Sequence, residues 1–193
     1  MFYSPLRYPG GKGKLASFME YMIIKLEHKG GTYIEPFAGG AGIAIELLLK
    51  DVVSQIVIND YDKGIWSFWK AILTETDRFI DKVRTVPLTM EEWYRQREIA
   101  VSQNDKYSFE LGFATFYMNR TNRSGIIKGG VIGGLEQAGS WTMDVRFNRE
   151  ELIKRIQSIA ARKKDIKLYN KDINSFITRY IPMYEENALI YFD

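Results

Sequence analysis

The sequence contains no cysteine, and this absence excludes several kinds of site at once. A disulfide-stabilised scaffold, a zinc site with cysteine ligands and a catalytic thiol all require at least one cysteine. The chain also has a single histidine, His28, which excludes a metal centre built from several imidazoles. We therefore expect a protein without a metal cofactor.

Long hydrophobic runs are absent as well. No apolar stretch approaches the ~20 residues that a membrane-spanning helix needs, and residues 1–13 lack the apolar segment of a signal peptide. The chain has 193 residues, of which 46% are hydrophobic, enough to build a core. We expect a cytoplasmic protein that does not bind membranes.

Charge is distributed unevenly along the chain, although the net charge is only +3. Residues 117–171 contain 12 Lys and Arg against 5 Asp and Glu, whereas the rest of the chain contains 15 against 19. A basic segment on a mildly acidic body is typical of a surface that binds a polyanion. A solvated helix surface produces the same excess, so charge alone leaves both interpretations open.

The hydrophobic pattern predicts an α/β core at the start of the chain. A helix over residues 14–27 is followed by a strand (Thr32–Glu35), a glycine-rich turn, a helix over 43–49 and a second strand (Gln55–Asn59). A strand, helix and strand in this order predict two parallel strands joined by a right-handed crossover.

The middle of the chain changes character. Helical patterns cover residues 62–73, 76–86, 90–103 and 107–119, and residues 120–147 then contain six glycines in a long loop. A helix that opens at Asn148 and strands at Ile166–Tyr169 and 188–192 return to the α/β pattern. We predict a Rossmann-like core from residues 1–60 and 148–193, interrupted by a mostly helical insertion over 61–147.

The first strand ends in a glycine cluster with the sequence Glu-Pro-Phe-Ala-Gly-Gly-Ala-Gly over residues 35–42. Glycines at such a turn let a ligand approach the backbone closely. Asp60 ends the next strand, 21 positions after Gly39, where a carboxylate can accept hydrogen bonds from both ribose hydroxyls of a nucleoside. The cluster matches neither the dinucleotide fingerprint nor a phosphate-binding loop, and a glycine turn chosen for packing alone is the other interpretation.

Two segments together resemble the DNA adenine methyltransferase (Dam-like) family. The glycine cluster looks like the cofactor motif of S-adenosylmethionine-dependent methyltransferases, and Pro-Leu-Arg-Tyr-Pro-Gly-Gly-Lys over residues 5–12 resembles the family's opening motif, which usually has Trp in place of Tyr8. The resemblance implies a Rossmann-like methyltransferase sheet with an inserted DNA-recognition domain. It also implies S-adenosyl-L-methionine as cofactor, contacted by Tyr8, Lys12, Phe37, Gly39, Asp60 and Asp193.

A third segment, Phe-Tyr-Met-Asn-Arg-Thr-Asn-Arg-Ser-Gly over residues 116–125, resembles the start of the loop with which this family touches its target. The resemblance implies double-stranded DNA as the partner. Arg and Lys suit contacts to phosphate or guanine, and Asn suits contacts to adenine. The residues expected to contact DNA are Arg120, Asn122, Arg123 and Lys128.

The printed sequence ends in an apolar segment followed by Asp193. In this family such a strand runs into Asp-Pro-Pro-Tyr, so the resemblance implies that Asp193 is the catalytic residue. It would accept a hydrogen bond from the exocyclic amino group of an adenine that has left the duplex. Because the Pro-Pro-Tyr part is not in this sequence, we expect a C-terminally truncated form with little methyl transfer.

Two other functions remain open at this stage. One is a catalytically incomplete remnant of the family that binds cofactor and DNA. The other is a nicotinamide-dependent oxidoreductase built on the glycine turn and Asp60, which leaves residues 8–12 and the Arg-rich loop unexplained. The family resemblance also allows a paired restriction endonuclease, which the methyltransferase would not require physically.

Overall fold

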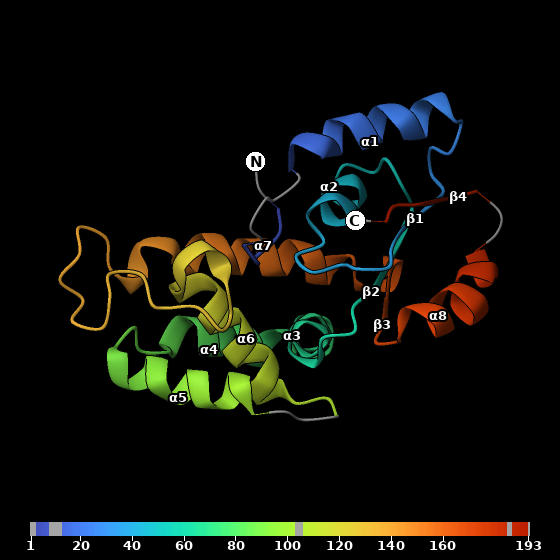
Figure 1. Cartoon of the computed structure of the whole chain (residues 1–193). Helices are drawn as coiled ribbons and strands as arrows, with labels where there is room; N and C mark the ends of the chain where they lie inside the picture. The colour runs from blue at the N-terminus through green and yellow to red at the C-terminus, as the bar shows by residue number, and fades with distance from the viewer. Residues whose placement is uncertain (1–2, 8–12, 103–105, 185–186, 193) are drawn as a thin grey trace.

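The computed structural model of the chain describes residues 3–7, 13–102, 106–184 and 187–192 (Figure 1). The helices are α1 (Gly13–Lys25), α2 (Gly42–Leu49), α3 (Lys63–Thr74), α4 (Thr76–Thr85), α5 (Met90–Val101), α6 (Phe109–Thr121), α7 (Arg149–Ala161) and α8 (Ile173–Ser175), the last continued by a π-helical turn (Phe176–Tyr180) and a 3-10 turn (Ile181–Tyr184). The strands are β1 (Thr32–Glu35), β2 (Gln55–Asn59), β3 (Ile166–Tyr169) and β4 (Ala188–Ile190). Further 3-10 turns lie at Arg123–Gly125, Met143–Arg146 and Lys163–Asp165.

The four described strands form one parallel sheet in the order β3-β2-β1-β4. Ile34 of β1 lies opposite Val57 of β2 on one side and Ile190 of β4 on the other. The Rossmann-like α/β architecture and the parallel pairing of β1 with β2 are therefore confirmed. All carboxyl ends point to one edge, where ligands bind in open sheets of this kind.

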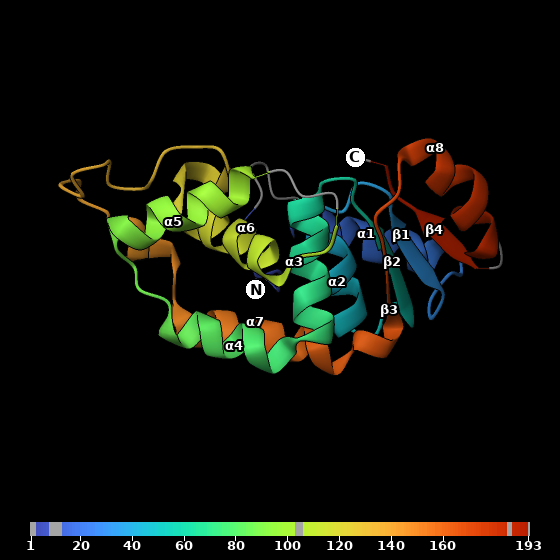
Figure 2. The same ribbon diagram turned by 90° about the horizontal axis from the view of Figure 1, so that it is seen from below.

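Helices cover both faces of the sheet (Figure 2). Tyr33 and Ile56 belong to the large buried cluster that also contains side chains of α1, α2, α3 and α7. Their neighbours Ile34 and Val57 point to the opposite face, where Phe176 packs against them. Successive strand residues point to opposite faces, so the continuous apolar runs of β1 and β2 follow from burial on both sides.

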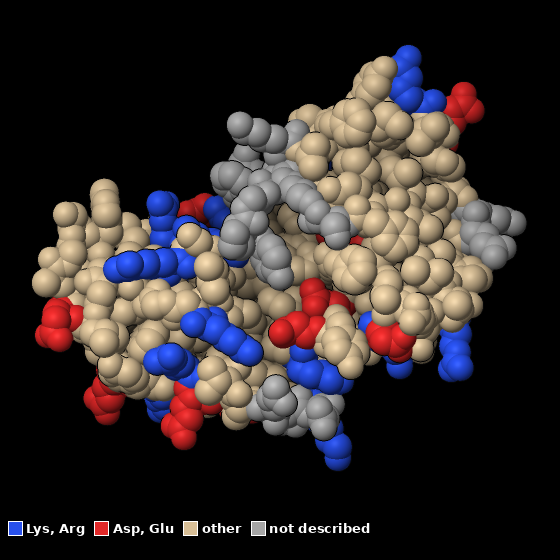
Figure 3. Space-filling model, in the orientation of Figure 1, with Lys and Arg blue, Asp and Glu red and all other residues tan. Residues whose placement is uncertain are grey.

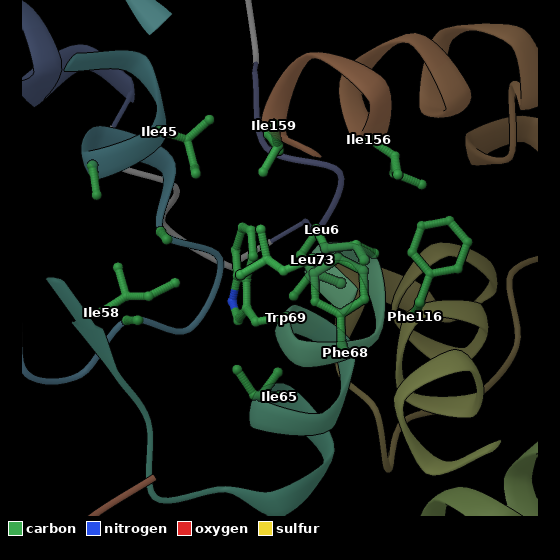
Figure 4. Close-up of a cluster of buried hydrophobic side chains, with 14 of the residues drawn as sticks. Leu6, Ile45, Ile58, Ile65, Phe68, Trp69, Leu73, Phe116, Ile156 and Ile159 are labelled. Carbon is green, nitrogen blue, oxygen red and sulfur yellow. The ribbon is translucent and has the colours of Figure 1, made fainter. Parts of the chain in front are cut away.

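The large core continues through α3 from the sheet into the helical lobe, which consists of α4, α5, α6 and the loop at residues 122–147 (Figure 4). On α3, Trp69 and Phe68 lie between Ile58 of β2 and Phe116 of α6 (Figure 4). A Cβ added to Gly112 of α6 would lie 2.6 Å from the Ser67 carbonyl, so α3 and α6 approach at backbone distance. The division at residues 60 and 147 remains a prediction, and α3 packs on both sides of it.

At the end of the chain, the structure differs from the sequence pattern in two respects. The sequence pattern assigned no regular element to residues 170–187, yet residues 173–184 form helical turns against the sheet. Phe176, Tyr180 and Tyr184, spaced four apart, supply their apolar face. β4 ends at Ile190 rather than at residue 192.

Within the described ranges, no helix is both long and apolar enough to cross a membrane. Nor does any group of three or more His, Asp or Glu in those ranges have the arrangement of a metal site.

Candidate functional site

The glycine turn after β1 and the loop after β2 meet at the carboxyl edge of the sheet. The Gly39 N–H donates to Asp60 Oδ2 at 2.8 Å, and the Asp62 N–H donates to Asp60 Oδ1 at 2.9 Å. The Ala38 N–H adds a hydrogen bond to the Asn59 carbonyl at 2.8 Å. The structure thus brings together the glycine cluster and the carboxylate that their spacing in the sequence singled out.

The turn itself is tight. Gly39 has φ +46° and Ala41 has φ +44°, both in the left-handed region, and the indole N–H of Trp69 donates to the Gly39 carbonyl at 2.9 Å. Trp69 is fully buried, as expected of a core residue. The helix that follows, α2, contains no Lys or Arg, so this turn lacks the basic side chain that a phosphate-binding loop provides.

The groups presented at this edge fit a nucleoside without phosphates. Burial raises the pKa of Asp60 above the usual range, and its two backbone hydrogen bonds partly oppose that rise. A carboxylate can accept about four hydrogen bonds, so Asp60 retains acceptor capacity for two hydroxyls. Phe37, two residues before Gly39 in the same turn, is 50% exposed and offers an aromatic surface. A ribose and a flat purine ring match these two surfaces.

Two amide side chains that the sequence analysis did not single out hold this edge together. The Asn59 Nδ2 donates to the carbonyls of Pro36 and Lys171, and Asn59 Oδ1 accepts from the Lys171 N–H at 2.9 Å. Asn170 Nδ2 donates to the Asp60 carbonyl at 2.7 Å. A polar residue ending the apolar strand Gln55–Asn59 was the available signal.

Residues 3–7 form an arm that crosses from the glycine turn to the helical lobe. The Ser4 hydroxyl donates to the Gly40 carbonyl at 2.5 Å, and Arg155 Nη1 donates to the Ser4 carbonyl at 2.9 Å. Tyr8 and Lys12, which were expected to contact the cofactor, lie outside the described residues.

Asn119 of α6 joins this arm to the loop at residues 122–147. Its Oδ1 accepts from the Arg7 N–H at 2.7 Å, while its Nδ2 donates to the Arg7 carbonyl at 2.7 Å and to the Gly125 carbonyl at 2.9 Å. The side chain is buried. One amide therefore fixes the arm against the start of the loop.

Asn122 organises the loop from inside. Its Nδ2 donates to the carbonyls of Ile126, Ile127 and Gly129 at 3.0, 2.9 and 3.1 Å, and its Oδ1 accepts from the Trp93 indole at 2.8 Å. The residue has no exposed surface. Buried polar groups need partners, and here the partners are the loop's own carbonyls.

Arg120 is also directed inward. It is 8% exposed, its Nε donates to the Arg146 carbonyl at 2.7 Å, and its Nη1 reaches the Pro5 carbonyl at 3.5 Å. Arg120 Nε and the amide of Asn122 make their hydrogen bonds within the protein, and contact of these two residues with DNA stays a prediction.

Arg123 and Lys128 face solvent on the same loop. The loop returns on itself beside them through a hydrogen bond from the Arg123 N–H to the Gly130 carbonyl at 3.0 Å. Lys and Arg side chains, with several Asp and Glu between them, lie on this lobe, whereas the visible surface over the sheet carries fewer charges (Figure 3). These two residues therefore remain candidates for contact with a polyanion.

Asp193 lies outside the described residues. The chain before it stays beside β1, since the Tyr191 N–H donates to the Ile34 carbonyl at 2.9 Å.

Comparisons with known proteins show the family of the chain. A sequence model of the family described as D12 class N6 adenine-specific DNA methyltransferase matches residues 8–193. The chain is also similar to the type II methyltransferase M.MjaIII of Methanocaldococcus jannaschii, with 22% identity over 200 residues. That match covers 97% of this chain and 67% of the relative.

Proposed function

Because the chain belongs to the D12 class of N6 adenine-specific DNA methyltransferases, we propose that it binds S-adenosylmethionine and directs methylation to the exocyclic amino group of adenine in double-stranded DNA. The observation that supports the cofactor site best is the hydrogen bond from the Gly39 N–H to Asp60. It holds a carboxylate with free acceptor capacity against the turn that also carries the exposed Phe37.

In this proposal, different residues at the carboxyl edge of the sheet contact different parts of the cofactor. Asp60 accepts from the two ribose hydroxyls, and Phe37 lies against the purine ring. Gly39 allows close approach of the backbone, and Tyr8 and Lys12 are proposed to complete the site from the arm. When bound, S-adenosylmethionine supplies the methyl group on a positively charged sulfur.

The adenine must leave the duplex to reach this edge. Its amino nitrogen is a weak nucleophile because the lone pair is delocalised into the ring. Asp193, which follows β4 in the sequence, is proposed to accept a hydrogen bond from an amino N–H and so favour a geometry that can attack. The chain's contribution is to orient the base and exclude water.

DNA is proposed to lie on the face that carries Arg123 and Lys128, with the remaining basic residues of 117–171 contributing longer-range attraction. Arg123 and Lys128 are exposed on a folded loop. Their long, positively charged side chains suit contacts to DNA phosphates or to base edges.

The cofactor proposal is tested by titration calorimetry with S-adenosylmethionine. Asp60→Asn should weaken binding about tenfold or more, because each hydrogen bond to a charged group contributes roughly 1.5–3 kcal/mol. Asp51→Asn is the matched control, since it makes the same chemical change at an exposed position before β2, at the opposite edge of the sheet. Equal affinity of wild type and Asp60→Asn would contradict the site.

The reaction is tested separately by incubating the chain with cofactor and plasmid DNA and measuring N6-methyladenine by mass spectrometry of the hydrolysed DNA. Methylated adenine above the level of a no-cofactor control supports the proposal. Methylation of cytosine instead of adenine would contradict it.

A further inference from the structure

Four arginines lie where the arm meets the end of the loop. Arg120 is at the centre, because the charges of the other three, Arg155, Arg7 and Arg146, all act on its guanidinium. Together with burial, which is the largest cause, these charges hold the pKa of Arg120 well below its usual range. Glu151 is the carboxylate whose charge opposes the effect.

Two of the four arginines have their hydrogen bonds made within the protein. Arg120 donates to the carbonyls of Arg146 and Pro5, and Arg155 donates to the Ser4 carbonyl and pairs with Glu151. Both arginines therefore hold backbone segments in place. Arg155 and Arg120 bind carbonyls of the arm, and Arg120 also binds the backbone carbonyl of Arg146.

The side chains of the other two arginines have no such partners. Among the residues that the structure describes, neither the Arg7 nor the Arg146 guanidinium makes a hydrogen bond or ion pair, and Arg7 Nη1 is buried without an acceptor. Arg146 is exposed and Arg7 half-buried. The charge of Arg146 also contributes to lowering the pKa of Arg7, after burial.

The geometry brings the segments that carry these arginines together, because Arg120 donates to the Pro5 carbonyl of the arm and to the Arg146 carbonyl of the loop. The like charges oppose one another, and Glu151, whose charge has the opposite effect on Arg120, pairs with Arg155. Unpaired buried donors are rare in folded proteins and point to a missing partner. An anion between Arg7 and Arg146 would neutralise the repulsion and accept the free N–H groups.

We propose that Arg7 and Arg146 form a phosphate-binding site that takes a backbone phosphodiester of the bound DNA, with Arg120 and Arg155 as the positioning residues behind it. The inference rests on the proposed DNA substrate. The guanidinium fork matches phosphate geometry, and both side chains belong to segments, the arm and the loop, that approach one another at this point. Free inorganic phosphate shares the same chemistry and is the other source of such a group.

Binding of a duplex to wild type, Arg7→Ala and Arg146→Ala should be measured across a range of salt concentrations. Each variant should bind about tenfold more weakly and lower the slope of log affinity against log salt by about 0.9, the value for one phosphate. Arg179→Ala is the matched control, since it makes the same chemical change at an exposed arginine outside the basic segment 117–171. It should leave the slope near that of wild type.

The phosphate itself is identified with duplexes that each carry one neutral methylphosphonate. At one position, the methylphosphonate should weaken binding to wild type by about the same factor as Arg146→Ala. At that position it should not weaken binding to Arg146→Ala any further. Unchanged slopes in both arginine variants, or methylphosphonate effects fully additive to them at every position, would overturn the inference.

Thermal unfolding with inorganic phosphate alone separates the two sources. Stabilisation of wild type but not of Arg146→Ala, together with no methylphosphonate effect, would overturn the assignment to DNA and give the site to free phosphate. Failure of wild type to bind any duplex is a different result, because it contradicts the proposed function rather than this site alone.

Discussion

The glycine turn at residues 35–42 and the loop at residues 122–147 are held in shape by different means. The turn is fixed by strand ends and by backbone N–H groups, such as the one that Gly39 donates to Asp60. The loop contains only short 3-10 turns, and the side chains of Asn119 and Asn122 supply much of its order. Glu35, the charged residue of the turn, is buried and accepts a hydrogen bond from the Ala44 N–H, whereas the buried amides that open the loop donate to carbonyls of the loop itself.

This difference shows how a long irregular loop uses its polar residues. Its backbone carbonyls have few regular partners, so buried amides must satisfy them before any side chain is available for a ligand. The outward-facing residues, such as Arg123 and Lys128, are the ones left to contact a partner.

The largest expected effect comes from Asn122→Ala. The change removes three donated hydrogen bonds and leaves the buried Trp93 indole unpaired, so the free energy of unfolding should fall by about 3 kcal/mol. Urea unfolding measures it, with Arg123→Ala as the exposed control, which should stay within about 0.5 kcal/mol of wild type. Wild-type stability of Asn122→Ala combined with lost DNA binding would return this side chain to the role of a DNA contact.

Gly125→Ala should have the next largest effect, about 2 kcal/mol of stability. Gly125 has φ +76°, where an L side chain costs roughly 1–2 kcal/mol, and its Cβ would lie 2.5 Å from the Arg7 carbonyl. Gly130→Ala is the control in the same loop, because its Cβ would meet nothing within 4 Å. Equal melting temperatures for the two variants would show that the arm and loop do not depend on this contact.

The pH dependence of cofactor binding tests the role of the Asp60 carboxylate at the glycine turn. We expect its effect to be smaller than that of the two substitutions above. The pKa of Asp60 lies above the usual 3.8, so its carboxylate gains a proton at milder acidity than an ordinary aspartate. Because the ionised form is the one that accepts from the ribose, affinity should begin to fall as the pH drops through this raised pKa, by about 1.4 kcal/mol per pH unit below it. Calorimetry at several pH values measures the loss, and Asp60→Asn should abolish this dependence.

Lys128→Ala should have the smallest effect, because an exposed lysine contributes less than about 1 kcal/mol through a single ionic contact. If Lys128 touches phosphate, DNA binding weakens equally for all sequences and the salt slope falls by about 0.9. If it reads a base, the loss is confined to duplexes with one base at one position. Binding to a panel of duplexes distinguishes the two roles.

The sequence predicted the parts of the fold whose signal is local. The strands at Thr32–Glu35 and Gln55–Asn59 are short apolar runs next to glycine or polar residues, and the structure confirms both. The turns at residues 173–184 were missed because Pro182 and several polar residues interrupt the spacing of Phe176, Tyr180 and Tyr184.

For the candidate site, the spacing of residues in the sequence indicated which of them lie close together. Residue type alone did not indicate which polar side chains are buried. The sequence analysis assigned Gly39 and Asp60 to one candidate site, and the structure brings them within hydrogen-bond distance because they follow two adjacent parallel strands. The burial of Asn122 depends on Trp93, 29 residues away, and on carbonyls whose positions only the folded loop defines. No local pattern carries that information.

The packing of α3 also constrains protein engineering. Exchanging recognition regions between related enzymes is attractive when such a region is a separable cassette, and residues 61–147 resemble one in the linear sequence. α3 opens that range, yet Trp69 supports the Gly39 turn and Ser67 contacts the α6 backbone at Gly112. A chimera joined at residue 60 would therefore replace α3, and with it the support of the sheet edge, by a foreign helix. An exchange that retains α3 would instead need an incoming α6 with a glycine at the position of Gly112, where the two helices approach at backbone distance.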